Sequence, residues 1–422
     1  MTQSSPKSSD VLVTGLGPVS SIGVGRDAFW HALLEGRTNV QDRCMPVDIG
    51  KTVDLPIAGM PAPEELPGYQ RHQELLAAHD LTQQRDMAYS LIAIELALQD
   101  AGLTMDGDRI GMIQAFEAPG VETTVGRMLG LFGSGEPPPR DFSVYQTLAQ
   151  SFYNMQPFLY VHVMAKAFGF RGFCTNVHNA CATGAFAIDA AAQQIRNQAA
   201  DVMVVVGGEA FDTAVRLEWF RALSLYAGEH VMRPFGPSPS GFYVGEGGIA
   251  LVLESAEHAR KRGAEAYAEY VGGSFCHQAW KQTLPDVRSE RLTGVMTDVM
   301  QRHDLSSDRV DLILPHAACT SLSDNYESHC VARAIGAGSN AMASAFKPHI
   351  GHMLAASGLM ELAAGLLSMR HGSVPGTLHA DSCSKLGEVP LRAEVVERQV
   401  DLLMKLSTGF TGHDAASLYK RV

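Results

Sequence analysis

One cysteine stands where a thiol could act as a nucleophile. Cys181 lies in NACATG, between the alternating segment 173–179, which predicts a strand, and the Ala-rich segment 182–195, which has apolar residues at helical spacing. A thiol on such a turn faces the N-terminus of the helix, where the helix dipole and free backbone N–H groups favour the nucleophilic thiolate. The same N–H groups can stabilise an oxyanion. A lone cysteine is more often a buried core residue, so this chemistry needs partners elsewhere in the chain.

Short motifs around Cys181 and further along the chain resemble those of the elongating β-ketoacyl-acyl carrier protein synthases. NACATG resembles the nucleophile turn of that family. PHAACT, with His316, falls where the family has its HGTxT motif, and FKPHIGH, with Lys347 and His352, falls where it has KxxxGH. Three further matches are the opening 11–20, the segment 233–247 and the closing 409–410. The resemblance runs from about residue 10 to the C-terminus.

The resemblance implies a two-step condensation. An acyl group is first transferred to Cys181, which supplies the soft nucleophile that this step needs. The acyl group is then joined to a carbanion made by decarboxylating a malonyl thioester. His316 and His352, with N–H groups directed at one oxygen, would stabilise the enolate of this second step. Lys347 would set the local field and orient its neighbours by hydrogen bonds, a role we prefer to direct acid–base catalysis.

The family also forms an acyl-transfer oxyanion hole from two backbone N–H groups, which here would belong to Cys181 and Phe410. Gly409 and Phe410 follow a predicted strand, and the Phe410 ring resembles the family's gate between pocket and entrance. The motif HGTxT has become HAACT in this chain. Ala318 therefore removes one of the two hydroxyl groups that hold the pantetheine arm in the family, whereas Thr320 keeps the other.

The closing loop departs from the family as well. The usual GFGGTN reads GFTGHD, so that Thr411 replaces a flexible glycine and, being β-branched, restricts the backbone. An enzyme of housekeeping fatty-acid synthesis would be expected to keep these features. The departures therefore favour a specialised type II polyketide or modified fatty-acid pathway.

The elements that must position these residues alternate between strands and helices. Predicted strands cover 11–16, 109–114, 173–179, 202–207, 248–253, 266–272, 310–314, 341–345, 402–406 and 416–420. Predicted helices cover 86–101, 158–168, 182–196, 291–301, 325–334 and 353–369. Predicted loops cover 132–140 and 236–241. This alternation predicts an α/β protein with mixed sheets covered by helices on both faces.

The family resemblance implies the thiolase fold, a five-layered α-β-α-β-α arrangement of two similar βαβαβ-type halves. Residues 10–255 would form the half with the nucleophile, and residues 256–422 the half with the histidines and the lysine. Similarity between the two halves of the sequence is too weak to prove a duplication.

Bulk properties fit a globular enzyme. The 422 residues are 46% hydrophobic and 18% charged, which allows an ample core. Seven cysteines form no CxxC pair, so no disulfide framework or zinc site is predicted. His349 and His352 lack further ligands at metal spacing, so no metal is expected. GLG at 15–17 lacks the third glycine of a dinucleotide-binding loop, so no cofactor is expected.

Charge and hydropathy limit the classes of partner that the chain could bind. A net charge of −12 argues against nucleic acid, and no apolar run approaches the length of a membrane span. The first ten residues lack the apolar core of a signal peptide, so a cytoplasmic location is expected. The implied partner is an acyl carrier protein with phosphopantetheine-bound acyl and malonyl groups. Because carrier proteins are acidic, docking needs a local basic patch, for which Arg216 and Arg221 are candidates. A homodimer, or a heterodimer with a related subunit, is also implied.

Three other classes of protein share parts of this pattern. A thiolase would use a second cysteine near the C-terminus and would lack the motif lysine, whereas Lys347 is present and no cysteine follows Cys383. A binding subunit of the chain-length-factor type usually replaces the nucleophile, whereas Cys181 is retained. An acyltransferase-like homologue could keep the thiol and lose decarboxylation, which the altered HGTxT motif allows. The last two classes remain alternatives to the condensing enzyme.

Overall fold

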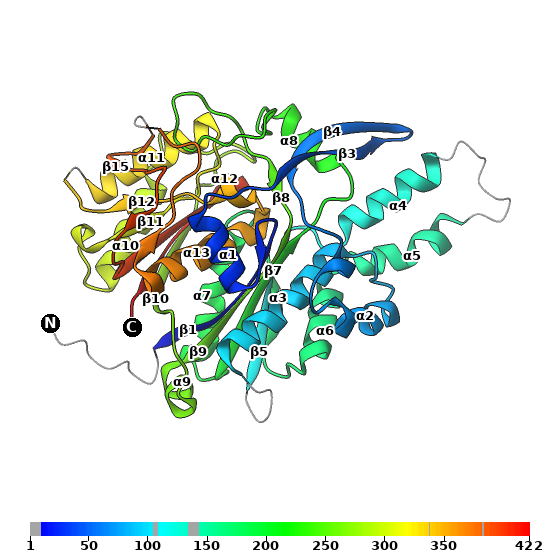
Figure 1. The fold of residues 1–422 in the computed structure, drawn as a ribbon, viewed down its shortest axis with the longest axis horizontal. Helices are drawn as coiled ribbons and strands as arrows, with labels where there is room; N and C mark the ends of the chain where they lie inside the picture. Colours follow the sequence, from blue (N-terminus) through cyan, green and yellow to red (C-terminus); the bar gives the residue numbers. More distant parts are fainter. Residues whose placement is uncertain (1–9, 104–108, 134–142, 337, 382–383) are drawn as a thin grey trace.

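A computed structural model describes residues 10–103, 109–133, 143–336, 338–381 and 384–422. Its main sheet has eleven strands (Figure 1). The first half of the chain contributes β1 (Val11–Ser20), β2 (Gly23–Val24), β5 (Ile110–Ala115), β6 (Cys174–Val177), β7 (Val202–Glu209) and β9 (Gly247–Ser255). The second half contributes β10 (Ala268–His277), β11 (Leu312–Leu314), β12 (Met342–Ala343), β17 (Leu402–Gly409) and β18 (His413–Lys420).

The two halves of this sheet repeat one topology. The strands run in the order β6-β5-β7-β9-β1 in the first half and β12-β11-β17-β18-β10 in the second. The short strand β2 pairs only with β1 and lies off this path. Without it, numbering the strands by appearance within each half gives 3-2-4-5-1 for both, and the parallel and antiparallel pairings also correspond. β1 and β10 join the halves by antiparallel pairing of residues 11–13 with 268–270. The topology thus reveals a repeat that the sequence alone does not establish.

Helices cover the sheet in layers. On the first half, α3 (Arg85–Ala101) and α6 (Pro157–Phe168) pack on the outer face. On the second half, α10 (Arg291–Arg302) and α11 (Ser321–Ile335) do the same. Between the halves lie α7 (Thr183–Arg196) and α13 (Ser357–His371), which share one apolar core with the inner faces of both. The predicted five-layered α-β-α-β-α arrangement is therefore confirmed.

The inner helices differ from the outer ones in burial. Residues 357–369 of α13 are all buried, as expected of a helix that is covered on every side. Strand alternation divides the residues of β7 between the layers: Val204 and Val206 face the outer core, whereas Met203 and Val205 face the inner core. The inner layer is therefore where elements of the two halves meet.

Every predicted strand and helix is present, with ends displaced by at most five residues. The predicted loop 236–241 contains no helix or strand. The loop predicted at 132–140 begins with the last two residues of α4 and otherwise lies outside the described residues. The predicted boundary between residues 255 and 256 falls between β9 and α9, and the division into two domains stays a prediction. No helix in the described ranges is long and apolar enough to cross a membrane.

Sequence periodicity missed several elements, chiefly peripheral ones. Its missed helices are α1 (Arg26–Leu34), α2 (Tyr69–Ala78), α4 (Val121–Gly133), α5 (Val144–Asn154), α8 (Val215–Ala222), α9 (Ala256–Arg262) and α12 (Lys347–Ile350). Its missed strands are β2, β3 (Val40–Asp48), β4 (Lys51–Ala58), β8 (Val244–Gly245), β13 (Ser373–Val374), β14 (Lys385–Leu386), β15 (Val389–Pro390) and β16 (Val396–Glu397). Four 3-10 turns cover Pro63–Glu65, Ser307–Arg309, Leu354–Ala356 and Phe410–Gly412. Strand β3 is largely exposed, so it lacks the apolar alternation that signals a strand.

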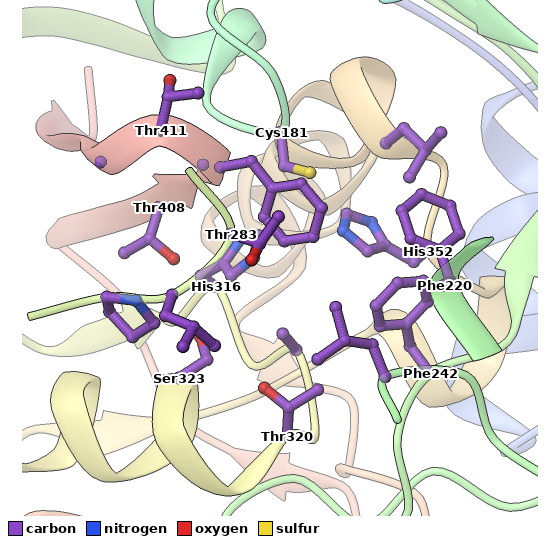
Figure 2. Close-up of a pocket in the computed structure, with 18 of the residues that line it drawn as sticks. Cys181, Phe220, Phe242, Thr283, His316, Thr320, Ser323, His352, Thr408 and Thr411 are labelled. Atoms are coloured by element: carbon purple, nitrogen blue, oxygen red, sulfur yellow. The ribbon is translucent and has the colours of Figure 1, made fainter. Parts of the chain in front are cut away.

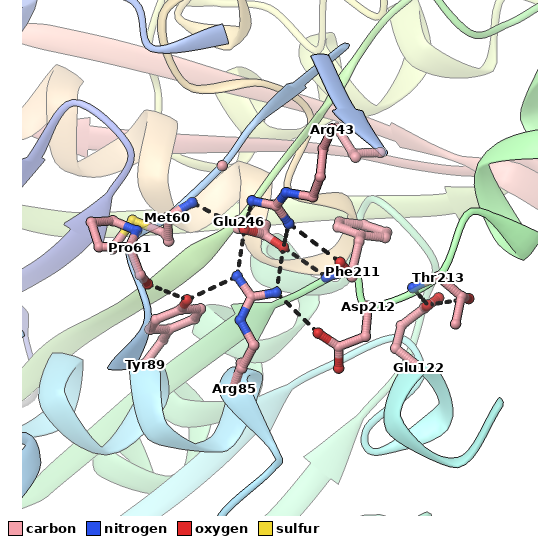
Figure 3. A network of polar contacts seen from close by, with 12 residues as sticks. Arg43, Met60, Pro61, Arg85, Tyr89, Glu122, Phe211, Asp212, Thr213 and Glu246 are labelled. Carbon is pink, nitrogen blue, oxygen red and sulfur yellow. Dashed lines mark hydrogen bonds and ion pairs between the residues drawn. The ribbon is translucent and has the colours of Figure 1, made fainter. Parts of the chain in front are cut away.

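A buried carboxylate ties the β3–β4 hairpin to the body of the molecule (Figure 3). Glu246, between β8 and β9, is fully buried and accepts hydrogen bonds from Arg43 of β3 (2.7 and 2.9 Å) and Arg85 of α3 (2.9 and 2.7 Å). The backbone N–H groups of Met60 and Phe211 also donate to it. Burial alone would raise the pKa of Glu246, but the two guanidinium groups lower it from 4.5 to about 2.

We expect Glu246→Ala to destabilise the fold by about 3–5 kcal/mol, because it leaves two guanidinium groups without their buried partner. Urea unfolding at pH 7 measures this change. Because the folded pKa lies below 4.5, the carboxylate stabilises the fold above that pH, and this contribution is lost as the pH falls through about 2.

A matched control for Glu246→Ala is Glu257→Ala. Glu257 forms an exposed ion pair with Lys261, at 2.7 Å within α9. Its removal should leave the unfolding midpoint unchanged. Equal stability of the two variants would contradict the role assigned to Glu246.

Candidate active site

One cavity of the structure receives residues from both halves of the chain (Figure 2). Cys181 comes from the first half, whereas His316, His352, Gly409 and Phe410 come from the second. Three more of the predicted site residues line the same cavity: Ala318, Thr320 and Thr411. The remaining one, Lys347, is fully buried and donates a hydrogen bond to the backbone carbonyl of His316.

The walls of this cavity differ in polarity. Phe220 and Phe242 lie on the side of His352, whereas Thr408 and Ser323 lie on the other side (Figure 2). Aromatic side chains suit apolar parts of a ligand, and hydroxyl groups can hydrogen-bond to amides. The cavity is therefore able to hold a ligand that is apolar along one edge and polar along the other.

Cys181 occupies a strained turn between β6 and α7. Ala180, which precedes it, has a φ of 49°, in the left-handed region that non-glycine residues rarely adopt. Thr183 holds the turn with its side chain, because its Oγ1 accepts from the backbone N–H of Asn179 (2.8 Å) and donates to the carbonyl of Ala180. Cys181 is 8% exposed and lines the cavity wall. The turn therefore presents Cys181 at the N-terminus of a buried helix.

The resting thiol of Cys181 is protonated at neutral pH. Burial raises the pKa of Cys181 well above its usual range, and Glu117 raises it further. Lys347 opposes this increase, and Glu209 adds a lesser one. The helix terminus alone was expected to favour the thiolate, and this expectation is not met in the free protein. The main reason is burial of the thiol, to which the acidic side chain of Glu117 adds, and the sequence indicates neither the burial nor this neighbour.

The end of β17 lies directly against this turn. A Cβ atom on Gly409 would lie 2.9 Å from the carbonyl oxygen of Asn179, so only glycine permits this approach. The Phe410 ring packs edge-on against Trp219, with centroids 5.8 Å apart. Thr411 has a φ of 65°, an uncommon conformation for a β-branched residue. Close contact at Gly409 brings the backbone of Phe410 beside Cys181.

The two predicted histidines lie together and are uncharged. Their ring centroids are 5.5 Å apart at an interplanar angle of 76°. Burial lowers the pKa of both His316 and His352 well below 6.5, and the nearby charges of Lys347 and Lys405 lower it further. Nδ1 of His352 lies 2.8 Å from Oγ of Ser357. If this hydroxyl donates, the other ring nitrogen of His352 carries its proton and can donate to a ligand.

The loop that carries His316 is held by buried carboxylate and ammonium groups. Glu327 of α11 accepts from the backbone N–H groups of His316 (2.6 Å) and Ala317 (2.9 Å). Ala317 and Cys319 have φ values of 52° and 59°, so the loop is strained at two positions. Such a loop keeps its geometry only when its surroundings hold it from several sides.

Three charged side chains lie behind the histidines. Glu361 of α13 binds the ammonium group of Lys347 at 2.5 Å and that of Lys405, on β17, at 2.6 Å. Sequence reasoning found only Lys347 of these three. A lysine within the apolar run LLMKLSTG and a glutamate within SGLMELAAGLL are charges that must be buried and paired, and this signal could have identified both. Ser357, Glu327 and Glu117 carried no comparable signal.

Two residues considered in the sequence analysis lie outside the cavity. His349 is fully buried, with its ring nitrogens 3.1 and 2.9 Å from the carbonyl oxygens of Arg37 and Gly376, so it is structural. The prediction that Arg216 belongs to a docking patch is wrong, because its side chain is largely buried and pairs with Glu122 and Glu209. The prediction failed because the fold places these two acidic residues beside Arg216, a contact that the sequence does not show. The described residues contain no group of His, Cys, Asp or Glu able to hold a metal ion.

Two family models match most of the chain. Residues 8–259 match a family described as the N-terminal domain of β-ketoacyl synthases, and residues 267–381 match the C-terminal domain. The chain is 28% identical to 3-oxoacyl-[acyl-carrier-protein] synthase 2 of Coxiella burnetii, with 98% of each chain covered. It is also 28% identical to the tetracenomycin polyketide synthase ketoacyl synthase alpha subunit of Streptomyces glaucescens, with 97% of each covered.

Solved structures are similar over almost the whole chain. A β-ketoacyl synthase from Burkholderia phymatum has a TM-score of 0.79 at 25% identity, with 98% of this chain and 99% of that one covered. A ketosynthase of a type II polyketide synthase, solved with its acyl carrier protein, has a TM-score of 0.81 at 24% identity and the same coverage. The ishigamide ketosynthase/chain length factor has a TM-score of 0.79 at 24% identity, again with that coverage.

We expect Glu117→Gln to speed alkylation of Cys181 by iodoacetamide at pH 8 by about threefold or more. The substitution removes a carboxylate that raises the pKa of the thiol, so more thiolate is present at that pH. Peptide mass mapping over time gives the rate. Exposed Cys44 serves as an internal standard whose rate should not change. An unchanged or slower reaction at Cys181 would remove Glu117 from the electrostatic account of the thiol.

Proposed function

The chain belongs to the β-ketoacyl synthase family, and we propose that it joins an acyl group, held on Cys181, to a malonyl-acyl carrier protein thioester by decarboxylative Claisen condensation. The observation that carries this proposal is the convergence of Cys181, His316 and His352 on one cavity from opposite halves of the chain. A thiol nucleophile beside two uncharged imidazoles matches the two steps of that reaction.

In the first step, the sulfur of Cys181 attacks the carbonyl carbon of the incoming acyl thioester. The backbone N–H groups of Cys181 and Phe410 stabilise the oxyanion that forms. The C–S bond to the pantetheine arm then breaks, and the departing thiolate takes the proton that the thiol of Cys181 gives up. Because the thiol of Cys181 has a raised pKa, it keeps this proton until a substrate arrives.

In the second step, the malonyl thioester loses carbon dioxide and leaves an enolate. N–H groups of His316 and His352 donate hydrogen bonds to its oxygen. The lowered pKa values of both rings indicate that they donate as neutral imidazoles, each from one ring nitrogen. The carbanion attacks the acyl carbon on Cys181, the bond to sulfur breaks, and the thiolate takes up a proton. The product is a β-ketoacyl thioester, two carbons longer than the acyl group.

Further proposals concern the pathway, the partners and the location of this reaction. The relatives include enzymes of fatty-acid and of polyketide synthesis, and Ala318 and Thr411 favour a specialised pathway. The partner is an acyl carrier protein, and the enzyme acts as a homodimer or with a related subunit. We also propose a cytoplasmic location, since the cysteines among the described residues are free, as expected in a reducing compartment. Cell fractionation tests this location.

Two alternatives in the same family make different use of the cavity. A binding subunit of the chain-length-factor type would not form an acyl adduct, and retention of Cys181 argues against it. An acyltransferase would form the adduct without releasing carbon dioxide from a malonyl thioester. The observation that favours the acyltransferase is the strained HAACT loop, which carries only one of the two threonines of the HGTxT motif.

We expect Cys181→Ala to abolish the acyl adduct that intact mass spectrometry detects after incubation with an acyl carrier thioester. His316→Ala and His352→Ala should keep this adduct and lower condensation by about a hundredfold or more, because each removes a donor to the enolate. Cys44→Ala, at an exposed cysteine, is the control. An adduct that survives in Cys181→Ala, or condensation at the normal rate without either histidine, would refute these assignments.

The variant Ala318→Thr tests the departure from HGTxT. Ala318 lines the cavity, and a restored hydroxyl should add one hydrogen bond to the pantetheine arm, worth about 0.5–1.5 kcal/mol. The KM for the carrier thioester should fall about three- to tenfold, with little change in kcat. Steady-state kinetics at varied carrier concentration measures this. An unchanged KM with full activity would show that the arm does not contact position 318.

A further inference from the structure

We propose that Lys405 is a positioning residue for decarboxylation, a second buried ammonium group that holds the His316 loop and adds positive charge behind both imidazoles. This inference rests on the proposed function, because it assigns a role within the same reaction. Neither the motifs in the sequence nor the comparisons assign a role to Lys405.

The contacts of Lys405 place it under the catalytic loop. Its side chain is 3% exposed, and its Nζ donates to Oε2 of Glu361 (2.6 Å) and to the backbone carbonyls of Leu406 (2.7 Å) and Pro315 (3.2 Å). Lys347 donates to the other oxygen of Glu361 and to the carbonyl of His316. Two ammonium groups therefore hold two consecutive carbonyls of the loop and are joined through one carboxylate.

Ion pairing alone does not explain this second lysine. One lysine is enough to neutralise Glu361, and burial of another ammonium group costs free energy. Burial lowers the pKa of Lys405, and the charge of Lys347 lowers it further, against the opposing effects of Glu361 and Glu327. A buried charge that carries such a cost, next to a reactive cavity, indicates a functional role more often than a stabilising one.

The charged and titratable groups around Lys405 are the carboxylates Glu361 and Glu327, the ammonium group of Lys347, and the two imidazoles. After burial, the charges of Lys347 and Lys405 are among the causes that keep the pKa of both histidines low. Lys405 therefore helps to keep both rings in the form that donates a hydrogen bond without carrying charge.

Strand β17 links this role to the acylation side of the cavity. Lys405 and Gly409 are four residues apart on the strand and so lie on the same face. Gly409 contacts the Cys181 turn, while Lys405 holds the His316 loop. One strand thus sets the position of the enolate donors relative to the acylated cysteine.

The test compares Lys405→Gln, which keeps hydrogen-bonding capacity and loses the charge, with Lys405→Arg, which keeps the charge. Release of carbon dioxide from malonyl carrier thioester is measured from pH 5 to 8, and acylation of Cys181 is measured by intact mass. In Lys405→Gln, removing a positive charge raises the pKa of both histidines, so the acid limb of the rate profile should move to higher pH. The kcat for decarboxylation should fall about ten- to hundredfold, with KM and acylation within about twofold.

Lys405→Arg should keep the acid limb of the wild-type protein. An acid limb and rate in Lys405→Gln equal to wild type, or the same displacement in Lys405→Arg, would overturn the inference. A wild-type protein that acylates Cys181 but releases no carbon dioxide would instead refute the proposed function. The two failures are therefore distinguishable.

A second comparison applies if Lys405→Gln does not fold. Glu361→Gln/Lys405→Met removes the carboxylate together with the ammonium group, so no buried carboxylate is left with an altered partner. Measured against Glu361→Gln alone, it isolates the charge of Lys405. The acid limb should lie at higher pH in the double variant, and coincident limbs would overturn the inference.

Discussion

Close packing of α7 against α13 is the contact on which the cavity depends. A Cβ atom on Gly184, in the first turn of α7, would lie 2.9 Å from Cγ of Leu359 in α13, so glycine permits the two helices to approach at their N-terminal ends. Cys181 lies just before α7, and His352 lies just before α13. Because each helix belongs to a different half of the chain, their contact brings together a nucleophile and an imidazole that are far apart in the sequence.

Electrostatics divides the cavity into two sides. The acidic side chains of Glu117 and Glu209 oppose ionisation of the Cys181 thiol, although burial raises their own pKa values, that of Glu209 to about 8. Lys347 and Lys405 oppose protonation of the histidines. Both fields favour uncharged forms, since a carboxylate opposes a thiolate and an ammonium group opposes an imidazolium. The resting site therefore holds a thiol and two neutral rings. Charge then develops in it only as substrates react, near donors that are already in place.

Strain concentrates in the segments that form this cavity. Ala180, Ala317, Cys319 and Thr411 all have positive φ values, and each lies in a turn or loop next to a reactive group. Each strained segment is held by hydrogen bonds or close packing, as Thr183 holds the Cys181 turn and Glu327 holds the His316 loop. Rigid support of this kind keeps donors and nucleophile at fixed positions while ligands enter and leave.

Local patterns in the sequence determined a large part of this protein. Strand and helix periodicity predicted the elements of the main layers, and the motifs around Cys181, His316 and Lys347 predicted which residues line or support one site. Such features depend on neighbours within a few residues, so spacing reveals them. Lys405 and Glu361, 44 positions apart, escaped this reasoning, and Arg216 was wrongly placed on the surface. Tertiary packing alone decided which groups pair with the buried charges, which charges act on the thiol and where the two helix ends meet. Each of these features joins segments whose distance in space has no relation to their distance along the chain.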